Sequence, residues 1–195
     1  ITALSIIFFN EGISFAENAR SVSRDYFNST PDTIYIKSAA RISDLNIDNE
    51  IRLPEDEYSI FISEESNQVY IRTALDISPS ERRSAWVEVT KRSSGRSKMD
   101  ATRKSDRLRY NYYIKGDTLS IDEYFTYPEG TKWSFDEVSV NIYIPKGTTI
   151  NMDKTVESLF HSYDDDDYVN DPLNRFWLMT EDGLEYNDSR QNTIP

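Results

Sequence analysis

The stretch Val138-Ser139-Val140-Asn141-Ile142-Tyr143-Ile144 places an aliphatic side chain at every second position. Because successive side chains of a β-strand point to opposite faces of the sheet, this alternation predicts a strand with one buried face. The same period recurs at residues 34–36, 58–62, 69–75, 85–89 and 119–121. Turn sequences rich in Gly, Pro and Asp separate these runs. We therefore expect a mainly β fold in which strands stack as an antiparallel or solenoid-like β-sandwich.

Two segments depart from this alternation and predict short helices. Residues 97–109 are rich in Lys and Arg and carry few apolar positions: Met99, Ala101 and Leu108. Residues 153–160 open with an aspartate, a favoured N-cap residue, and then space apolar residues along one helical face. We therefore expect two short helices beside the sheets.

The domain organisation expected from the sequence has three parts. Residues 1–30 form an N-terminal, membrane-proximal segment, residues 31–186 form the β domain, and residues 187–195 form a flexible tail. The apolar run at residues 1–9 is shorter than the roughly 20 residues that span a bilayer. It is either the first element of the domain or the remainder of a membrane segment. Because the sequence does not begin with Met, we expect it to be part of a longer protein.

Composition excludes several classes of protein. The chain has no cysteine, which excludes disulfides, thiolate metal sites and cysteine nucleophiles. Its net charge of −12 disfavours nucleic acid as a partner. The charge is uneven, because residues 91–109 are strongly basic and residues 151–195 strongly acidic. The two stretches either face each other or attract separate partners, and we expect the first because opposite charges attract within one domain.

Candidate catalytic and metal sites are weak. The run Asp164, Asp165, Asp166 and Asp167 offers carboxylate oxygens for calcium but lacks the spacing of an EF-hand loop, so we interpret it as a solvated acidic loop. His161 is the only histidine, and no Gly-x-Ser-x-Gly or phosphate-binding glycine motif occurs. Acidic pairs such as Asp122-Glu123 are plentiful, but nothing in the sequence places two of them in one cleft. We therefore expect no cofactor, no metal and no enzymatic activity.

The basic helix supplies the candidate interaction residues, namely Arg96, Lys98, Arg103, Lys104 and Arg107. Clustered basic side chains are attracted to anionic lipid headgroups. The alternative, which we favour at this point, is that they form a solvated face that neutralises the acids of the domain itself.

Three groups of sequence motifs carry a family resemblance: VEVTKRSSGRS at 87–97; LSIDEYF at 119–125 followed by VSVNIYIPKGT at 138–148; and WLMTEDGLE at 177–185. Together they resemble the C-terminal domain of Bacteroidetes phage shock protein C-like (PspC) membrane proteins, over roughly residues 60 to 186. The resemblance implies a toastrack fold related to adhesin-like and LiaF-type domains, and no catalytic residues.

The resemblance also implies a function. It points to an interaction or sensor domain of a membrane-anchored envelope-stress protein that acts by protein–protein contact. The anchor would lie in the inner membrane, through a segment missing from this chain, with the domain in the periplasm. Neither the protein partner nor the oligomeric state follows from the sequence. The alternative is an adhesin-like surface module that binds carbohydrate or another cell, which an exposed aromatic groove would favour.

Overall fold

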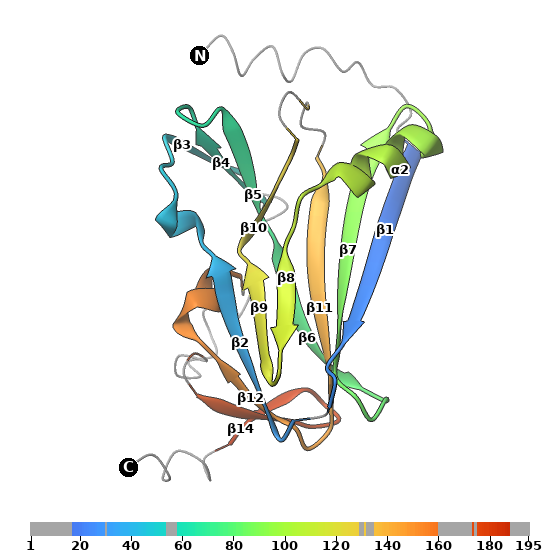
Figure 1. The fold of residues 1–195 in the computed structure, drawn as a ribbon, viewed down its shortest axis with the longest axis vertical. Coiled ribbons are helices and arrows are strands. Elements are labelled where there is room, and N and C mark those ends of the chain that lie inside the picture. Colours follow the sequence, from blue (N-terminus) through green and yellow to red (C-terminus); the bar gives the residue numbers. More distant parts are fainter. Residues whose placement is uncertain are drawn as a thin grey trace.

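The computed structural model describes residues 17–29, 31–53, 58–128, 131, 135–159, 173 and 175–187. Residues 1–16, the acidic run 164–167 and His161 lie outside the described residues. The described chain is mainly β, as expected, and its strands form three sheets that adjoin one another (Figure 1).

The first sheet is built around the strand that the sequence marks most clearly. Its order is β1 (Glu17–Tyr26), β7 (Trp86–Gly95), β11 (Glu137–Pro145) and β6 (Ala74–Ser80). Side chains of β11 alternate between buried and half-buried over most of its length, as the period of two predicts. β1 pairs with β7 along its full length, so the sheet extends into the segment 1–30.

The second sheet has six strands and the third has four. The second runs β14 (Leu184–Tyr186), β13 (Phe176–Met179), β12 (Thr149–Met152), β2 (Thr33–Ala40), β9 (Thr118–Asp122) and β8 (Tyr112–Lys115). The third runs β10 (Tyr124–Thr126), β5 (Gln68–Arg72), β4 (Tyr58–Ser63) and β3 (Asn49–Leu53).

Antiparallel pairing, one of the two arrangements expected, describes the hairpins and most other ladders. Three ladders are parallel instead: β2 with β9, β2 with β12, and β6 with β11. Each joins strands far apart in the sequence, where a crossover rather than a tight turn connects them.

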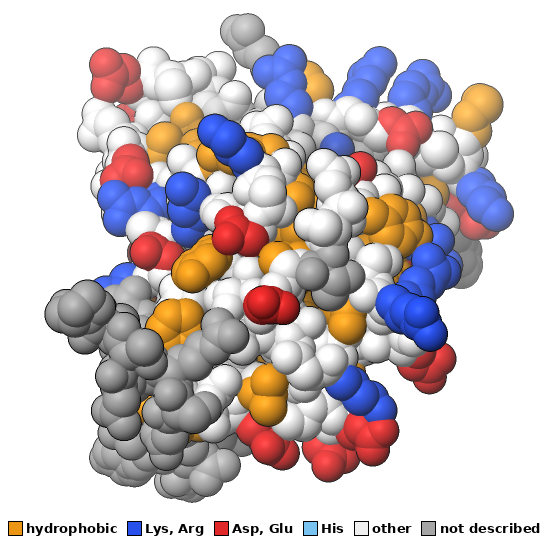
Figure 2. Space-filling model, turned by 60° about the horizontal axis from the view of Figure 1, so that its bottom comes forward, with side chains coloured by type: hydrophobic (Ala, Val, Ile, Leu, Met, Phe, Trp, Pro, Cys, Tyr) orange, Lys and Arg blue, Asp and Glu red, His pale blue; other side chains and the backbone are white. Residues whose placement is uncertain are grey.

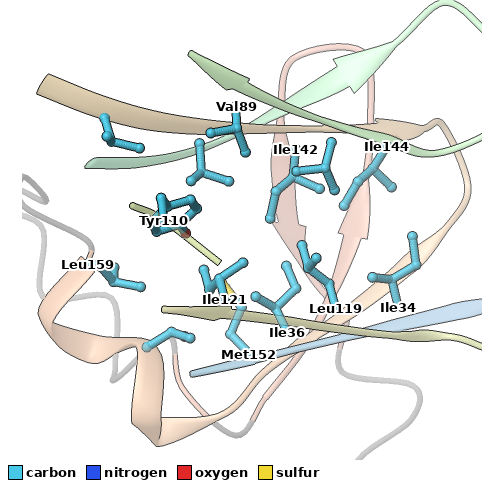
Figure 3. Close-up of a cluster of buried hydrophobic side chains, with 14 of the residues drawn as sticks. Ile34, Ile36, Val89, Tyr110, Leu119, Ile121, Ile142, Ile144, Met152 and Leu159 are labelled. Atoms are coloured by element: carbon cyan, nitrogen blue, oxygen red, sulfur yellow. The ribbon is translucent and has the colours of Figure 1, made fainter. Parts of the chain in front are cut away.

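The main core lies between the first and second sheets. Figure 3 shows Val89, Ile142 and Ile144 from the first sheet opposite Ile34 and Leu119 from the second. All five side chains are at most 1% exposed. The alternating apolar positions of the two sheets therefore face each other, as in a sandwich.

The chain passes from one sheet to another three times at a single junction, and Glu123 lies at its centre. The Glu123 backbone N–H donates to the Ala40 carbonyl at 2.9 Å, and its carbonyl accepts from the Thr73 N–H at 3.0 Å. Its carboxylate accepts from the Ile42 N–H at 2.8 Å and lies 3.5 Å from the Arg72 guanidinium. One buried residue thus ties together the chain after β2, between β5 and β6, and between β9 and β10.

Both expected helices are present, one of them in a different form. The helix expected over residues 97–109 is α2 (Lys98–Arg107), and the one expected over 153–160 is the 3-10 helix η2 (Lys154–Leu159). A further 3-10 turn, η1 (Ile42–Asp44), follows β2. In the part of the chain that the structure describes, no helix is long and apolar enough to cross a membrane.

Candidate functional site

The basic helix α2 is fixed at both ends by local contacts. Ser97 is its N-cap and accepts a hydrogen bond from the Asp100 N–H at 3.2 Å, while the Asp100 carboxylate accepts from the Arg96 N–H. Asp100 in the first turn and Lys104 and Arg107 in the last turn complement the helix dipole. The helix therefore has a well-defined start, although its composition is poor in apolar residues.

Gly95 determines how closely α2 approaches the first sheet. A Cβ at this position would lie 2.5 Å from the Ala101 nitrogen and 2.8 Å from the Asp100 carboxylate. Ala101 and Ser105 on the inner face of the helix are fully buried. The absence of a side chain at Gly95 thus allows the helix to pack directly on the ends of β1 and β7, with which it makes its main contacts.

The five candidate interaction residues lie together at this end of the molecule but differ in their partners. Lys104 folds back and donates to the Ser94 carbonyl at 3.1 Å. Arg103 lies 3.9 Å from the Asp100 carboxylate. Arg96, Lys98 and Arg107 are exposed and form no ion pair with any described residue.

Two exposed apolar side chains accompany the basic ones, and the sequence did not single them out as surface residues. Met99 is 75% exposed and Phe135 60% exposed. Met99 borders a hollow of about 590 Å³ beside α2, and Phe135 borders one of about 730 Å³ together with Lys98 and Arg92. Both hollows include Thr102 of α2, so they flank the same helix. We name the surface of Arg96, Lys98, Met99, Arg103, Arg107 and Phe135 the α2 surface.

Lys91 does not belong to this surface, although it lies in the same basic stretch. Its ammonium donates to the Leu108 carbonyl at 2.7 Å, just after α2 ends. Burial lowers the pKa of Lys91, against a smaller opposing effect of Asp106. Lys91 therefore anchors the end of the helix.

The basic stretch lies apart from the described part of the acidic stretch. Because residues 160–172, which carry the acidic run, lie outside the described residues, contact between the two stretches stays a prediction. α2 lies at the opposite end of the molecule from β12 and β14, which carry described parts of the acidic stretch (Figure 1). Glu181 forms an ion pair with Lys146, and the Asp153 carboxylate accepts a hydrogen bond from the Thr155 N–H at 2.9 Å. Figure 2 shows many Lys and Arg side chains along the upper and right margins, whereas Asp and Glu side chains occur along the lower margin and also at the upper left and in the centre.

A row of aromatic side chains crosses one face of the first sheet. Trp86 stacks on Tyr143 with ring centroids 4.0 Å apart and on Tyr26 at 6.1 Å. The guanidinium groups of Arg24 and Arg82 lie 5.6 and 5.7 Å from the Trp86 ring centroid. Because β1 and β11 flank β7 on opposite sides, neighbours cover both faces of the Trp86 ring.

A polar hollow of about 590 Å³ lies where β7, β9 and β10 approach one another, bordered by Lys91, Tyr110, Asp122 and Tyr124. The Asn111 amide donates to the Asp122 carboxylate at 2.8 Å, and burial is the main cause of the raised pKa of Asp122. Among the described residues that line the hollow, Asp122 is the one carboxylate. A pair of facing carboxylates, as glycoside hydrolysis requires, is not assembled there.

The acidic pairs and metal candidates form no cluster among the described residues. Asp122 and Glu123 are adjacent but bind different partners, Asn111 and Ile42. No group of three or more potential metal ligands is found among the residues that the structure describes. The weak calcium candidates Asp164 to Asp167 fall outside that part of the chain.

Comparison with known proteins identifies a family for this chain. The family model described as the ToastRack found in some PspC matches residues 61–192. No curated protein and no solved structure matches the chain.

Proposed function

Because the chain belongs to the toastrack family found in some PspC proteins, we propose that it is a non-catalytic interaction domain of a membrane-anchored envelope-stress protein. The family match over residues 61–192 is the observation that carries the proposal. In this proposal the anchor lies in the inner membrane and the domain lies in the periplasm. The domain binds a protein partner, and this binding is signalled to the membrane-anchored part of the protein.

The exposed edge strand of the first sheet supports docking of a protein. β1 is a ten-residue edge strand whose side chains are almost all exposed. Long edge strands offer unpaired backbone groups to a partner strand. Val22 in the middle of β1 is 40% exposed, which places an apolar side chain between the charged residues Arg20 and Arg24.

Site-specific photocrosslinking in cells tests this proposal. A photoreactive amino acid replaces Val22 in the full-length membrane protein, and a matched one replaces Tyr113, which is 52% exposed on the edge strand β8 of another sheet. We expect a discrete protein adduct from position 22 whose amount changes under envelope stress, and a weaker or absent adduct from position 113. No adduct at either position, or adducts that do not respond to stress, would contradict the proposal.

The aromatic row on the first sheet is the feature on which the adhesin-like alternative depends, and its geometry does not favour sugar binding. Sugar rings bind proteins by stacking on the open face of an aromatic side chain, and Trp86 has both faces covered by Tyr26, Tyr143 and the two arginines. Screening of the domain on a glycan array distinguishes the two functions. Saturable binding of one glycan that Trp86→Leu abolishes would favour the adhesin.

A further inference from the structure

We propose that the α2 surface docks on the headgroup layer of an anionic bilayer. The inference extends the proposed membrane attachment by naming the face that meets the membrane, and it does not depend on the protein partner.

The charge of the surface is the first argument. Residues 96–107 carry five basic side chains against Asp100 and Asp106. Arg96, Lys98 and Arg107 have no ion-pair partner among the described residues. Lys98 and Arg107 are the first and last residues of α2, which packs on the outside of the first sheet, and Arg96 immediately precedes its N-cap. Basic side chains near an anionic bilayer are attracted to its headgroups.

The apolar side chains are the second argument. Peripheral membrane surfaces combine basic residues with protruding apolar ones that enter the boundary between headgroups and acyl chains. Met99, at 75% exposure, has basic residues on both sides along α2. Phe135, at 60% exposure, borders the hollow that also contains Arg20, Arg92 and Lys98.

The backbone of Phe135 adds a third observation. Its φ angle is +52°, in the left-handed region where a bulky side chain is unfavourable and glycine or asparagine is preferred. A non-glycine residue held there is strained. Phe135 therefore presents a largely exposed aromatic side chain from an unfavourable backbone conformation.

The chain direction is the fourth argument. β1 begins at Glu17, which pairs with Gly95, the last residue of β7 before α2. The apolar stretch at residues 1–9 is joined to this point by residues 10–16, which reach at most about 25 Å when extended. A membrane contact by that stretch would hold this end of the sheet, and with it α2, close to the bilayer.

An acidic protein is the competing occupant, and the observations favour it less. It would account for the unpaired cations but not for Met99 and Phe135 beside them. The acidic stretch of the chain itself lies, in its described part, at the opposite end of the molecule.

Vesicle co-sedimentation of this 195-residue chain tests the proposal. Vesicles of phosphatidylcholine are compared with vesicles that also contain phosphatidylglycerol, and the salt concentration is raised in steps. We expect binding to the anionic vesicles that weakens with salt, because surface charges are screened. Equal binding to both kinds of vesicle, or none to either, would overturn the proposal.

A charge reversal locates the binding surface. The double variant Lys98→Glu, Arg107→Glu is compared with Lys115→Glu, Lys146→Glu. The second variant makes the same change of charge at the end of β8 and in the turn after β11, both distant from α2 (Figure 1). We expect the first to bind the anionic vesicles at least about tenfold more weakly and the second to lose much less, since the attraction is local. Because residues 1–9 are unchanged in both, equal loss in the two variants, or no loss in either, would show that the α2 surface is not the docking face. Thermal unfolding of both variants checks that each is folded.

The apolar contribution is measured with Phe135→Gly and Met99→Ser. Glycine relieves the positive φ at position 135, so we expect its thermal unfolding midpoint to stay close to that of the unmodified chain while vesicle binding falls. If both variants bind vesicles as well as the unmodified chain, the binding depends on charge alone. That result would contradict the contribution proposed for the Met99 and Phe135 side chains. Capture of an acidic protein on this surface without any binding to vesicles would assign it to a protein partner instead.

Discussion

The carboxylate of Glu123 accepts a hydrogen bond from the backbone N–H of Ile42 at 2.8 Å, across 81 positions of sequence. The Glu123 backbone also accepts a hydrogen bond from the Thr73 N–H and donates one to the Ala40 carbonyl. It is 4% exposed, so these contacts are made away from solvent. The three sheets therefore share one buried polar junction. The position of each chain segment that passes through it is held by hydrogen bonds to the same residue.

Glu123→Ala should therefore be strongly destabilising. The variant leaves the Ile42 N–H without its acceptor and the Arg72 guanidinium without its counter-charge, and removal of one partner of a buried pair costs about 3–5 kcal/mol. Glu123→Gln keeps a carbonyl acceptor and should lose less. Urea unfolding followed by circular dichroism measures both, with Glu181→Ala at an exposed ion pair as the control. A neutral Glu123→Ala would show that the junction does not hold the sheets together.

Gly95→Ala should displace α2 from the first sheet. The added Cβ would meet backbone atoms of Ala101, which cannot move without shifting the helix, and such overpacking costs about 1–3 kcal/mol. Gly116→Ala is the matched control: its φ of +63° strains an alanine, but nothing lies within 4 Å of the new Cβ. We expect amide chemical shifts of α2 to change in the first variant and to stay unchanged in the second. Identical spectra of α2 in both would contradict the close approach.

Tyr110 should make the protein sensitive to alkaline pH. Burial raises the pKa of its phenol well above the ordinary value, with smaller contributions from Asp122 and Tyr112. The unfolded chain loses this proton near pH 10, whereas the folded chain retains it. The stabilisation is therefore complete below about pH 10 and is lost as the pH rises toward the folded pKa.

Tyr110→Phe tests this and a second property of the same residue. The Tyr110 hydroxyl is buried and has no hydrogen-bond partner among the described residues. We expect the variant to be as stable as the unmodified chain, or more stable by up to about 1 kcal/mol, at neutral pH, since it removes an unsatisfied polar group. Its loss of stability above pH 10 should be shallower. An unchanged alkaline profile of the free energy of unfolding would contradict the assignment.

Asp153 should act in the opposite pH range. Hydrogen bonds from Thr155 lower the pKa of the Asp153 carboxylate below its ordinary value of 3.8. The contribution to stability is therefore present above the unfolded pKa and is lost as the pH falls through the folded one. Asp153→Asn should be slightly less stable at neutral pH and show a smaller loss on acidification, measured by thermal unfolding between neutral and acidic pH. A steeper acid response than that of the unmodified chain would contradict this.

The strands could be predicted from the sequence because their information is local. The alternation in 138–144 and 85–89 reports which face is buried, and in the structure Val87, Val89, Val140 and Ile142 are indeed at most 1% exposed. The basic helix could be predicted for the same reason, since the loss of the period of two and the density of Lys and Arg both mark the segment. The family could be recognised from short motifs, which is again a property of neighbouring residues.

The tertiary structure decided what depends on residues far apart. The run 69–75 alternates without interruption, but Thr73 lies between β5 and β6 of two different sheets, because its N–H donates to Glu123 rather than to a continuing ladder. The parallel ladders likewise depend on pairing between strands that are far apart in the sequence. The exposure of Met99 depends on how α2 packs against the first sheet. The sequence by itself therefore determined which faces of the strands are buried and which family the chain resembles. Only long-range packing decided which sheet each strand joins and which charges share a surface, because these depend on contacts that no local period encodes.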